Sequence, residues 1–253
     1  DRAYYSSSVS SFLRTSPDAV LGEVARNSGF AIELGQRDAW VKQIKVLREQ
    51  LMPWDSQGHL FFEFVVPRMG RRIDVLAIIK NTVFVIEFKV GESTFTRSAL
   101  DQVWDYALDL KNFHEPSHVI TIAPLLIATE SDSGFSAVAT SHHNDGVLLP
   151  IQVSPSSLKD CIEKVLWMSD GLAIDPLLWV SGRYKPTPTI VEAASALYGH
   201  HSVADLSRSD AGAKNLSVTS NAVSQLIRRV KDQHRKAICF ITGVPGAGKT
   251  LVG

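Results

Sequence analysis

The sequence has few cysteines, no long apolar run and no excess of charge of either sign. Its two cysteines, Cys161 and Cys239, exclude a disulfide-rich scaffold and a structural zinc site built from four cysteines. No apolar run approaches the roughly 18–20 residues that span a membrane, and residues 1–8 lack the apolar core of a signal peptide. We therefore expect a cytoplasmic protein with no membrane partner.

The charges balance, because 26 Lys and Arg residues face 26 Asp and Glu residues. Overall charge therefore gives no argument for nucleic-acid binding, and any basic surface must be local. The 253 residues are 45% hydrophobic and 21% charged, which is typical of a globular protein with one domain and part of another. The first residue is not Met, and only three residues follow Gly248-Lys249-Thr250. We expect a piece of a longer chain.

Hydrophobic periodicity predicts an alternation of helices and short strands. Apolar residues at spacings of three and four predict helices, and apolar runs rich in β-branched and aromatic residues predict strands. In chain order these are a helix over 37–51, strands over 60–66, 71–79 and 82–90, a helix over 98–112, strands over 119–128 and 146–153, and a helix over 156–168. Ser98 and Asp101 form a plausible capping box, and Pro124 favours an edge strand or a bulge. This order predicts an α/β fold, a mixed sheet flanked by helices.

The character of the chain changes near residue 185. Residues 199–220 are rich in Ser, Gly, Ala and Asp and read as a linker, 218–232 as a helix with a basic end, and 237–242 as a buried strand. We therefore divide the chain into an N-terminal segment of uncertain structure (1–35), an α/β domain (36–185), a linker with a basic helix (186–236) and the start of another domain (237–253).

Acidic residues interrupt two of the apolar strands. Alternation along 82–90 places Glu87 and Lys89 on one face, and a hairpin brings Asp74 of the preceding strand near Glu87. Two converging carboxylates repel each other and favour a cation such as Mg²⁺ or Mn²⁺. A lysine beside the metal can orient or deprotonate water, and the set is suited to phosphodiester hydrolysis. The alternative is an ordinary edge strand whose Glu and Lys face solvent.

A third carboxylate would complete such a site. We choose Glu63, because it lies between Phe62 and Phe64, where an unpaired carboxylate would otherwise be costly. Glu49 on the first helix is the second choice. The alternative for Glu63 is a position that faces solvent.

The motif resembles that of a known nuclease superfamily. Asp74, twelve residues and then Glu87-Phe88-Lys89 resemble the PD-(D/E)XK motif, and Gln102-Val-Trp-Asp-Tyr106 resembles the Gln-x-x-x-Tyr motif of RecB-like nucleases. Ile73 stands where the superfamily motif often has Pro. The resemblance covers about 60–165 and implies a restriction-endonuclease-like fold. More narrowly, the region resembles the nuclease-like part that precedes the helicase domain in some bacterial proteins.

The resemblance implies a Mg²⁺- or Mn²⁺-dependent deoxyribonuclease, an endonuclease rather than an exonuclease. Catalytic roles would fall to Asp74, Glu87, Lys89, Gln102 and Tyr106, and metal binding to Asp74, Glu87 and Glu63. Basic residues around the motif offer phosphate contacts, although each alone could serve only solubility; they are Arg68, Arg71, Arg72, Arg97 and Lys111.

The last residues fit a phosphate-binding loop. Residues 243–250 match G-x-x-x-x-G-K-[ST] directly after an apolar strand, which predicts nucleotide binding by Gly243, Gly246, Gly248, Lys249 and Thr250. The acid of the second NTPase motif is absent, so we expect ATP to be a cofactor only of a longer chain.

Taken together, these features predict a DNA nuclease coupled to an ATP-dependent, helicase-like motor, and by analogy alone a role in phage defence. The expected partner is DNA, with RNA, a second copy or a defence-system subunit left open. The first alternative is a catalytically silent module that docks nucleic acid to the motor. The second is nucleotide hydrolysis as the only activity of the full-length protein.

Overall fold

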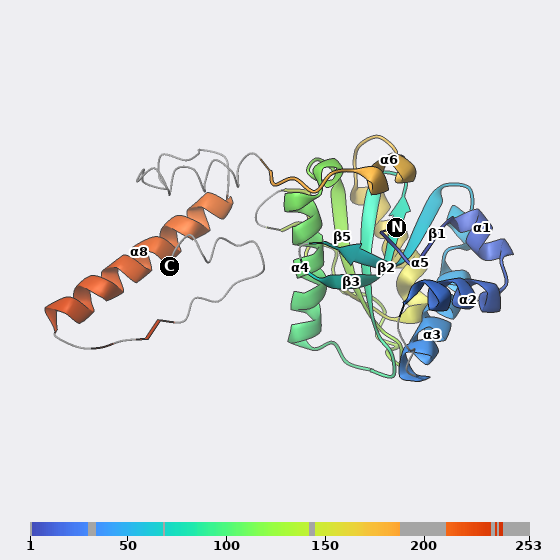
Figure 1. Cartoon of the computed structure of the whole chain (residues 1–253), viewed down its shortest axis with the longest axis horizontal. Helices are drawn as coiled ribbons and strands as arrows, with labels where there is room; N and C mark the ends of the chain where they lie inside the picture. Colours follow the sequence, from blue (N-terminus) through green and yellow to red (C-terminus); the bar gives the residue numbers. More distant parts are fainter. Residues whose placement is uncertain are drawn as a thin grey trace.

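Six strands form one mixed sheet in the order β1-β2-β3-β4-β5-β6 (Figure 1). The computed structural model describes residues 2–29, 34–67, 69–141, 145–187 and 211–233, together with 236, 238 and 239. The strands are β1 (Tyr5–Ser8), β2 (Gly58–Val66), β3 (Arg71–Ile79), β4 (Thr82–Lys89), β5 (Thr121–Ala128) and β6 (Ile151–Val153). β1 to β4 are antiparallel neighbours, whereas β4, β5 and β6 run parallel.

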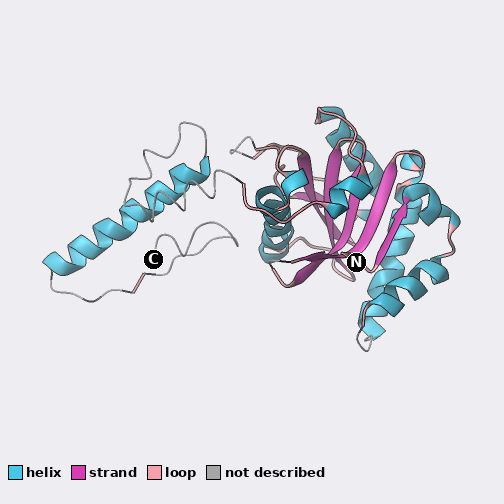
Figure 2. Cartoon of the chain, turned by 45° about the horizontal axis from the view of Figure 1, so that its top comes forward, coloured by secondary structure: helices cyan, strands magenta, loops and turns pink. Residues whose placement is uncertain are grey.

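Helices cover both faces of this sheet (Figures 1 and 2). One face packs against α1 (Val9–Arg14), α2 (Pro17–Asn27), α3 (Leu34–Gln50) and α5 (Leu158–Met168), and the other against α4 (Arg97–Phe113) and the short α6 (Pro176–Ser181). Short 3₁₀ turns lie at Met52–Trp54, Glu115–Ser117 and Pro155–Ser157. The central strands are apolar almost throughout because both faces are covered.

The predicted mixed α/β sheet flanked by helices is confirmed, and so is the order of its elements. Two details are corrected. Thr96, not Ser98, caps α4, since its hydroxyl accepts from the Ala99 N–H at 3.3 Å. β5 is not an edge strand; Pro124 is tolerated because the short ladder with β6 involves only Leu125–Ile127.

The N-terminal segment is part of this arrangement. Its residues form the edge strand β1, which pairs with β2, and two capped helices whose apolar side chains enter the core. The Ser8 and Ser16 hydroxyls accept from the backbone at the starts of α1 and α2. In this segment, two of the serines therefore mark the points at which helices begin.

The C-terminal part differs from its prediction in two places. The helix α8 (Ala211–Asp232) begins inside the stretch read as a linker, and its side chains described from residue 220 onward are exposed or half-buried. Of the buried strand predicted over 237–242, only Ile238 and Cys239 are described; both are exposed and neither lies in a strand. All the predicted nucleotide-binding residues lie outside the described part of the chain.

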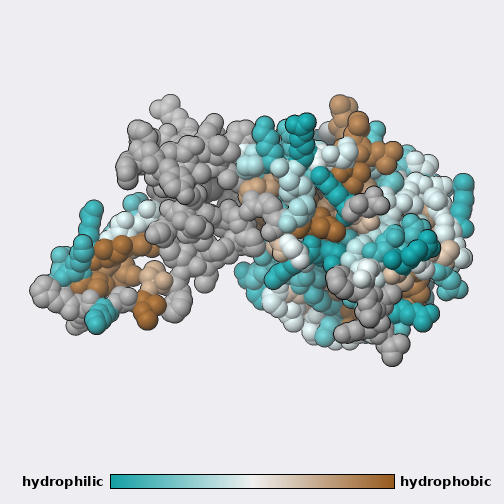
Figure 3. Space-filling model, in the orientation of Figure 1, coloured by the Kyte–Doolittle hydropathy of each residue, from teal (hydrophilic) through white to brown (hydrophobic). Residues whose placement is uncertain are grey.

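One apolar patch stays on the surface near α6. Leu172, Leu177 and Leu178 are 92%, 66% and 70% exposed, and Figure 3 shows hydrophobic side chains gathered over this helix. Among the described helices, none is both long and apolar enough to cross a membrane.

Candidate active site

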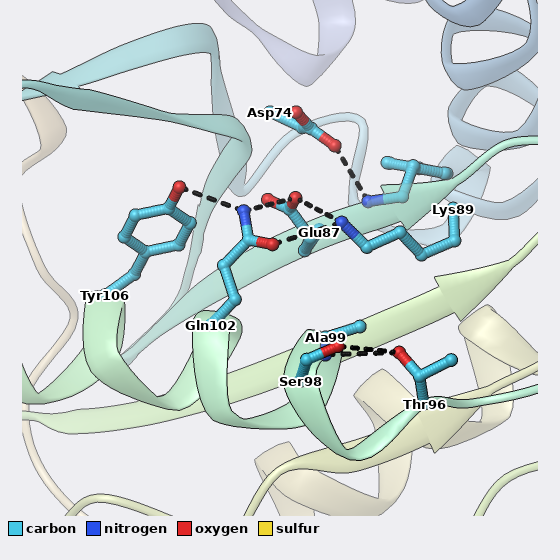
Figure 4. Close-up of polar contacts among 9 residues, drawn as sticks. Asp74, Glu87, Lys89, Thr96, Ser98, Ala99, Gln102 and Tyr106 are labelled. Atoms are coloured by element: carbon cyan, nitrogen blue, oxygen red, sulfur yellow. Dashed lines mark hydrogen bonds and ion pairs between the residues drawn. The ribbon is translucent and has the colours of Figure 1, made fainter. Parts of the chain in front are cut away.

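The site begins where β3 separates from β4. Their ladder ends at Val75 and Ile86, and one further step would pair Asp74 with Glu87. Instead the Asp74 carboxylate enters the gap and accepts a hydrogen bond from the Phe88 N–H at 2.8 Å (Figure 4). The Asp74 side chain thus takes the place of a backbone hydrogen bond between β3 and β4. The separation of the two strands therefore fixes the Asp74 carboxylate beside Glu87.

A second interruption lies on the other side of β3. Glu63 is skipped by the β2–β3 ladder, although the register places it opposite Asp74. Its φ of 51° is in the left-handed region, which costs a non-glycine residue about 1–3 kcal/mol. This conformation reverses the alternation of β2, so that Phe62 and Phe64 pack on opposite faces of the sheet. Three acids therefore occupy one row across three neighbouring strands.

Glu87 is held from the face covered by α4. Its Oε1 accepts from Lys89 Nζ at 3.0 Å and from Gln102 Nε2 at 2.8 Å. Lys89 Nζ also donates to Gln102 Oε1 at 3.1 Å, and Gln102 Nε2 donates to the Tyr106 hydroxyl at 3.1 Å. Gln102 and Tyr106 share one face of α4 because they are four residues apart. Figure 4 shows Glu87, Lys89 and Gln102 turned toward one another, with Tyr106 beyond Gln102.

One oxygen of this network has no partner. Glu87 is 4% exposed, and within the described residues its buried Oε2 makes no hydrogen bond. An unsatisfied buried carboxylate oxygen is costly unless a ligand, a water or an ion meets it. Glu87 therefore presents one oxygen that is ready to accept a cation.

Burial and like charges both act on these acids. Burial raises the pKa of Asp74 well above its usual range, and the neighbouring Glu87 carboxylate raises it further. Burial also raises the pKa of Glu87, although Lys89 opposes this effect. Both shifts mean that the pair resists carrying two negative charges without a cation.

Glu63 is placed differently from the other two acids. Its Oε1 accepts from Trp40 Nε1 at 2.8 Å and from Gln36 Nε2 at 3.3 Å, and its Oε2 accepts from Arg72 Nε at 2.8 Å. Both oxygens are thus engaged, whereas Glu87 Oε2 has no partner in the described part of the chain. Glu49, the second choice, is exposed near the end of α3.

The residues fit a hard divalent cation held mainly by two carboxylates. Across the described residues, no three carboxylate, imidazole or thiolate groups converge closely enough to hold a metal ion by themselves. Mg²⁺ commonly binds through one or two carboxylates and keeps several waters. Asp74 and Glu87 would be the ligands, and the buried Glu87 Oε2 is the feature that fits such an ion.

Of the basic candidates, Arg72 is the one with a described contact to an acid of this row, Glu63. Arg71 and Arg72 are exposed at the start of β3, and Arg72 binds Glu63. Arg97 is exposed and pairs with Asp101 at 3.1 Å. Arg68 lies outside the described residues.

Lys111 is not placed to contact a substrate strand. It is 6% exposed, and its Nζ donates to the Ile120 carbonyl at 2.7 Å. Burial lowers its pKa, which Asp145 partly offsets. Along α4 it is nine residues from Gln102, or about 13 Å. It ties α4 to the chain that leads into β5.

Sequence reasoning missed the residues that hold Glu63. Gln36 and Trp40 lie four apart on α3, a spacing that predicts a shared face but not what that face meets. Tyr4, whose ring lies 5.0 Å from the Arg72 guanidinium carbon, gave no sequence signal at all.

Comparison with known proteins adds no relative. No family model matches the chain, and neither a curated protein nor a solved structure matches it. The case for function therefore depends on the geometry of the site.

Proposed function

We propose that this chain is a metal-dependent nuclease with a restriction-endonuclease-like fold, and that it hydrolyses phosphodiester bonds of DNA. The observation that carries the proposal is the pair of carboxylates at the separation of β3 from β4. Asp74 is fixed there by the Phe88 N–H, and Glu87 carries a buried oxygen without a partner and an adjacent lysine. The resemblance to the PD-(D/E)XK and Gln-x-x-x-Tyr motifs supports the same reading.

Each residue then has a distinct role. A divalent cation, when bound by Asp74 and Glu87, would neutralise phosphate charge and make water easier to deprotonate. Lys89 holds its ammonium beside this centre, where it orients water and stabilises negative charge on the phosphate. Gln102 keeps Lys89 and Glu87 together through one amide, and Tyr106 fixes that amide from the other side.

A supercoiled-plasmid nicking assay tests the proposal. We expect cleavage with Mg²⁺ or Mn²⁺, none with EDTA, and none by Asp74→Asn or Glu87→Gln. Lys159→Ala is the matched control, because Lys159 is an exposed lysine on α5 that pairs only weakly with Glu163 at 4.0 Å. Cleavage that persists in EDTA would refute the metal assignment. Metal-dependent binding of DNA without cleavage would instead favour the docking module.

In a longer protein we propose that this nuclease is joined to an ATP-dependent motor. The sequence motif over 243–250 is the support for that step, and a role in phage defence rests on resemblance alone. The proposed motor requires that a longer chain hydrolyses ATP and that Lys249→Ala abolishes this hydrolysis.

A further inference from the structure

Arg72 is held on two sides next to the carboxylates. Its Nε donates to Glu63 Oε2 at 2.8 Å, and its guanidinium lies over the Tyr4 ring at 5.0 Å from the ring centre. Glu63 raises the pKa of Arg72, chiefly through this hydrogen bond. An arginine side chain that is normally mobile is therefore fixed in orientation by an acid and an aromatic ring.

The other edge of the guanidinium remains available. Within the described residues, the only side-chain hydrogen bond of Arg72 runs through Nε, and the side chain is 43% exposed. Arginine has four further N–H groups on its two terminal nitrogens, and this fork matches two phosphate oxygens. Arg72 thus combines a fixed orientation with a free, solvent-facing donor edge.

The position of this edge relates it to the candidate active site. Arg72 lies two residues before Asp74 on β3, and its partner Glu63 lies opposite Asp74 in the register of β2 and β3. The guanidinium therefore adjoins the row of acids, of which Asp74 and Glu87 would hold the cation.

We propose that Glu63 is a positioning residue rather than a metal ligand, and that it holds Arg72 as a preformed fork for a backbone phosphate of the nucleic-acid strand. This inference rests on the proposed function, since it assigns the strand beside the cleavage site. Glu63 Oε1 already accepts from two donors and Oε2 from the permanently charged Arg72, whereas Glu87 Oε2 has no partner among the described residues. Trp40 fixes Glu63 from the opposite side through a hydrogen bond that is buried at both ends.

Three variants distinguish a role of Glu63 in positioning Arg72 from a role in binding the metal. Glu63→Gln can keep the Trp40 bond through its amide oxygen but presents no charge to Arg72. Arg72→Lys keeps a charge but loses the fork. Asp74→Asn serves as the reference for a lost metal ligand.

The readouts are Mn²⁺ binding by calorimetry and DNA binding in EDTA as a function of salt. We expect Glu63→Gln and Arg72→Lys to bind Mn²⁺ within about 2-fold of wild type and DNA roughly 10-fold more weakly. For Arg72→Ala, the slope of log K against log salt should fall by about 0.7–0.9, the loss of one phosphate contact. A loss of Mn²⁺ affinity in Glu63→Gln as large as that in Asp74→Asn would overturn the inference.

Tyr4 gives a matched pair. Tyr4→Phe and Tyr4→Leu both lose the hydroxyl, which donates to the Ser28 carbonyl at 3.3 Å, but only Tyr4→Leu loses the ring under Arg72. We expect Tyr4→Phe to bind DNA as wild type does and Tyr4→Leu to bind about 2- to 5-fold more weakly, the range of an exposed cation–π contact. Equal weakening of DNA binding in both variants would show that the Tyr4 ring does not support Arg72.

A direct phosphate contact can be located with single neutral methylphosphonates placed along an oligonucleotide. At one position the methylphosphonate should weaken DNA binding by wild type but not by Arg72→Ala. If it weakens binding by the two proteins equally at every position, the contact is contradicted. Binding in EDTA does not depend on cleavage. A wild type that binds with this pattern but never cleaves would therefore defeat the proposed function and leave the Arg72 contact standing.

Discussion

At the scale of single residues, the site keeps two carboxylates in a place that opposes their ionisation. The native state binds a proton on Asp74 at a pH where the unfolded chain has lost it, because burial and Glu87 raise the Asp74 pKa. The contribution of Asp74 to the free energy of unfolding of the metal-free protein should therefore fall as pH rises from the ordinary aspartate pKa, about 4, towards the raised one. If the proposed cation binds here, the arrangement exchanges stability for that function.

Asp74→Asn should stabilise the metal-free protein and abolish cleavage. The amide oxygen can still accept from Phe88, while the repulsion with Glu87 disappears, so we expect a gain of about 1–2 kcal/mol near neutral pH. Urea unfolding in EDTA measures it, with the exposed Asp132→Asn as control. No gain over that control would contradict the electrostatic account, whatever happens to cleavage.

Lys89→Ala should change both the rate and its pH dependence. Loss of a positioned catalytic group lowers turnover by roughly 10²-fold or more. Lys89 also lowers the Glu87 pKa, so the acid limb of the pH–rate profile should move to higher pH in the variant. Full activity, or a profile with an unchanged acid limb, would remove Lys89 from these roles.

The inclusion of Gln102 and Tyr106 in the site was implied only by the resemblance to RecB-like nucleases. From periodicity alone, the shared strand face of Glu87 and Lys89 and the shared helix face of Gln102 and Tyr106 were predictable. The partners of Glu63 were not. They depend on a left-handed residue inside β2 and on a helix packed across the sheet, and neither leaves a periodic signal.

At the scale of elements, long apolar strands were predicted almost to the residue and short ones were not. β3 lies where the sequence placed it, because its apolar run ends at a turn where Lys80 has a φ of 53°. β1 is a four-residue edge strand of mostly serines, which carries no apolar pattern. Only pairing with β2 makes it a strand.

One contact between elements should be sensitive to acid. His114, at the end of α4, is fully buried; its Nδ1 lies 2.8 Å from Ser117 Oγ, and its ring centre lies 4.4 Å from that of Trp179 in α6. Burial lowers the pKa of His114 to about 4. The unfolded chain therefore binds the proton first as pH falls below about 6.5.

The contribution of His114 to the free energy of unfolding should thus fall as pH drops from about 6.5 to about 4, by up to ~3 kcal/mol, against the opposite contribution of Asp74. His114→Gln should remove this contribution, so that the stability difference between wild type and variant shrinks as pH falls, although the variant will be less stable at neutral pH. Urea unfolding across this pH range measures the difference, with His59→Gln for comparison, since burial lowers the pKa of His59 too. An unchanged slope in His114→Gln would show that another group dominates.

At the scale of the whole molecule, the sheet of residues 5–153 and its helices contain every proposed catalytic residue. Gln102 and Tyr106 reach the strands from α4, and the other site residues lie on β2, β3 and β4. The mixed sheet followed from composition and element order. The helix predicted over 218–232 is confirmed but begins earlier, at Ala211, because polar, alanine- and serine-rich helix starts resemble linkers in composition.

The phosphate loop should therefore be separable from DNA cleavage. None of the described side-chain hydrogen bonds or ion pairs of Asp74, Glu87, Lys89 or Gln102 involves residues beyond α4. The loop motif by itself supplies backbone donors and Lys249, whereas hydrolysis of ATP also needs an acid for Mg²⁺ and a residue that places water. We expect Lys249→Ala in the 253-residue chain to cleave DNA within about 2-fold of wild type, with no stimulation by ATP and no measurable ATP hydrolysis in either protein.

Parallel nicking and phosphate-release assays measure this, with Lys89→Ala as the variant that loses cleavage. ATP hydrolysis by the wild-type chain that disappears in Lys249→Ala would mean that a complete nucleotide site forms, and ATP-dependent cleavage would mean that it controls the nuclease.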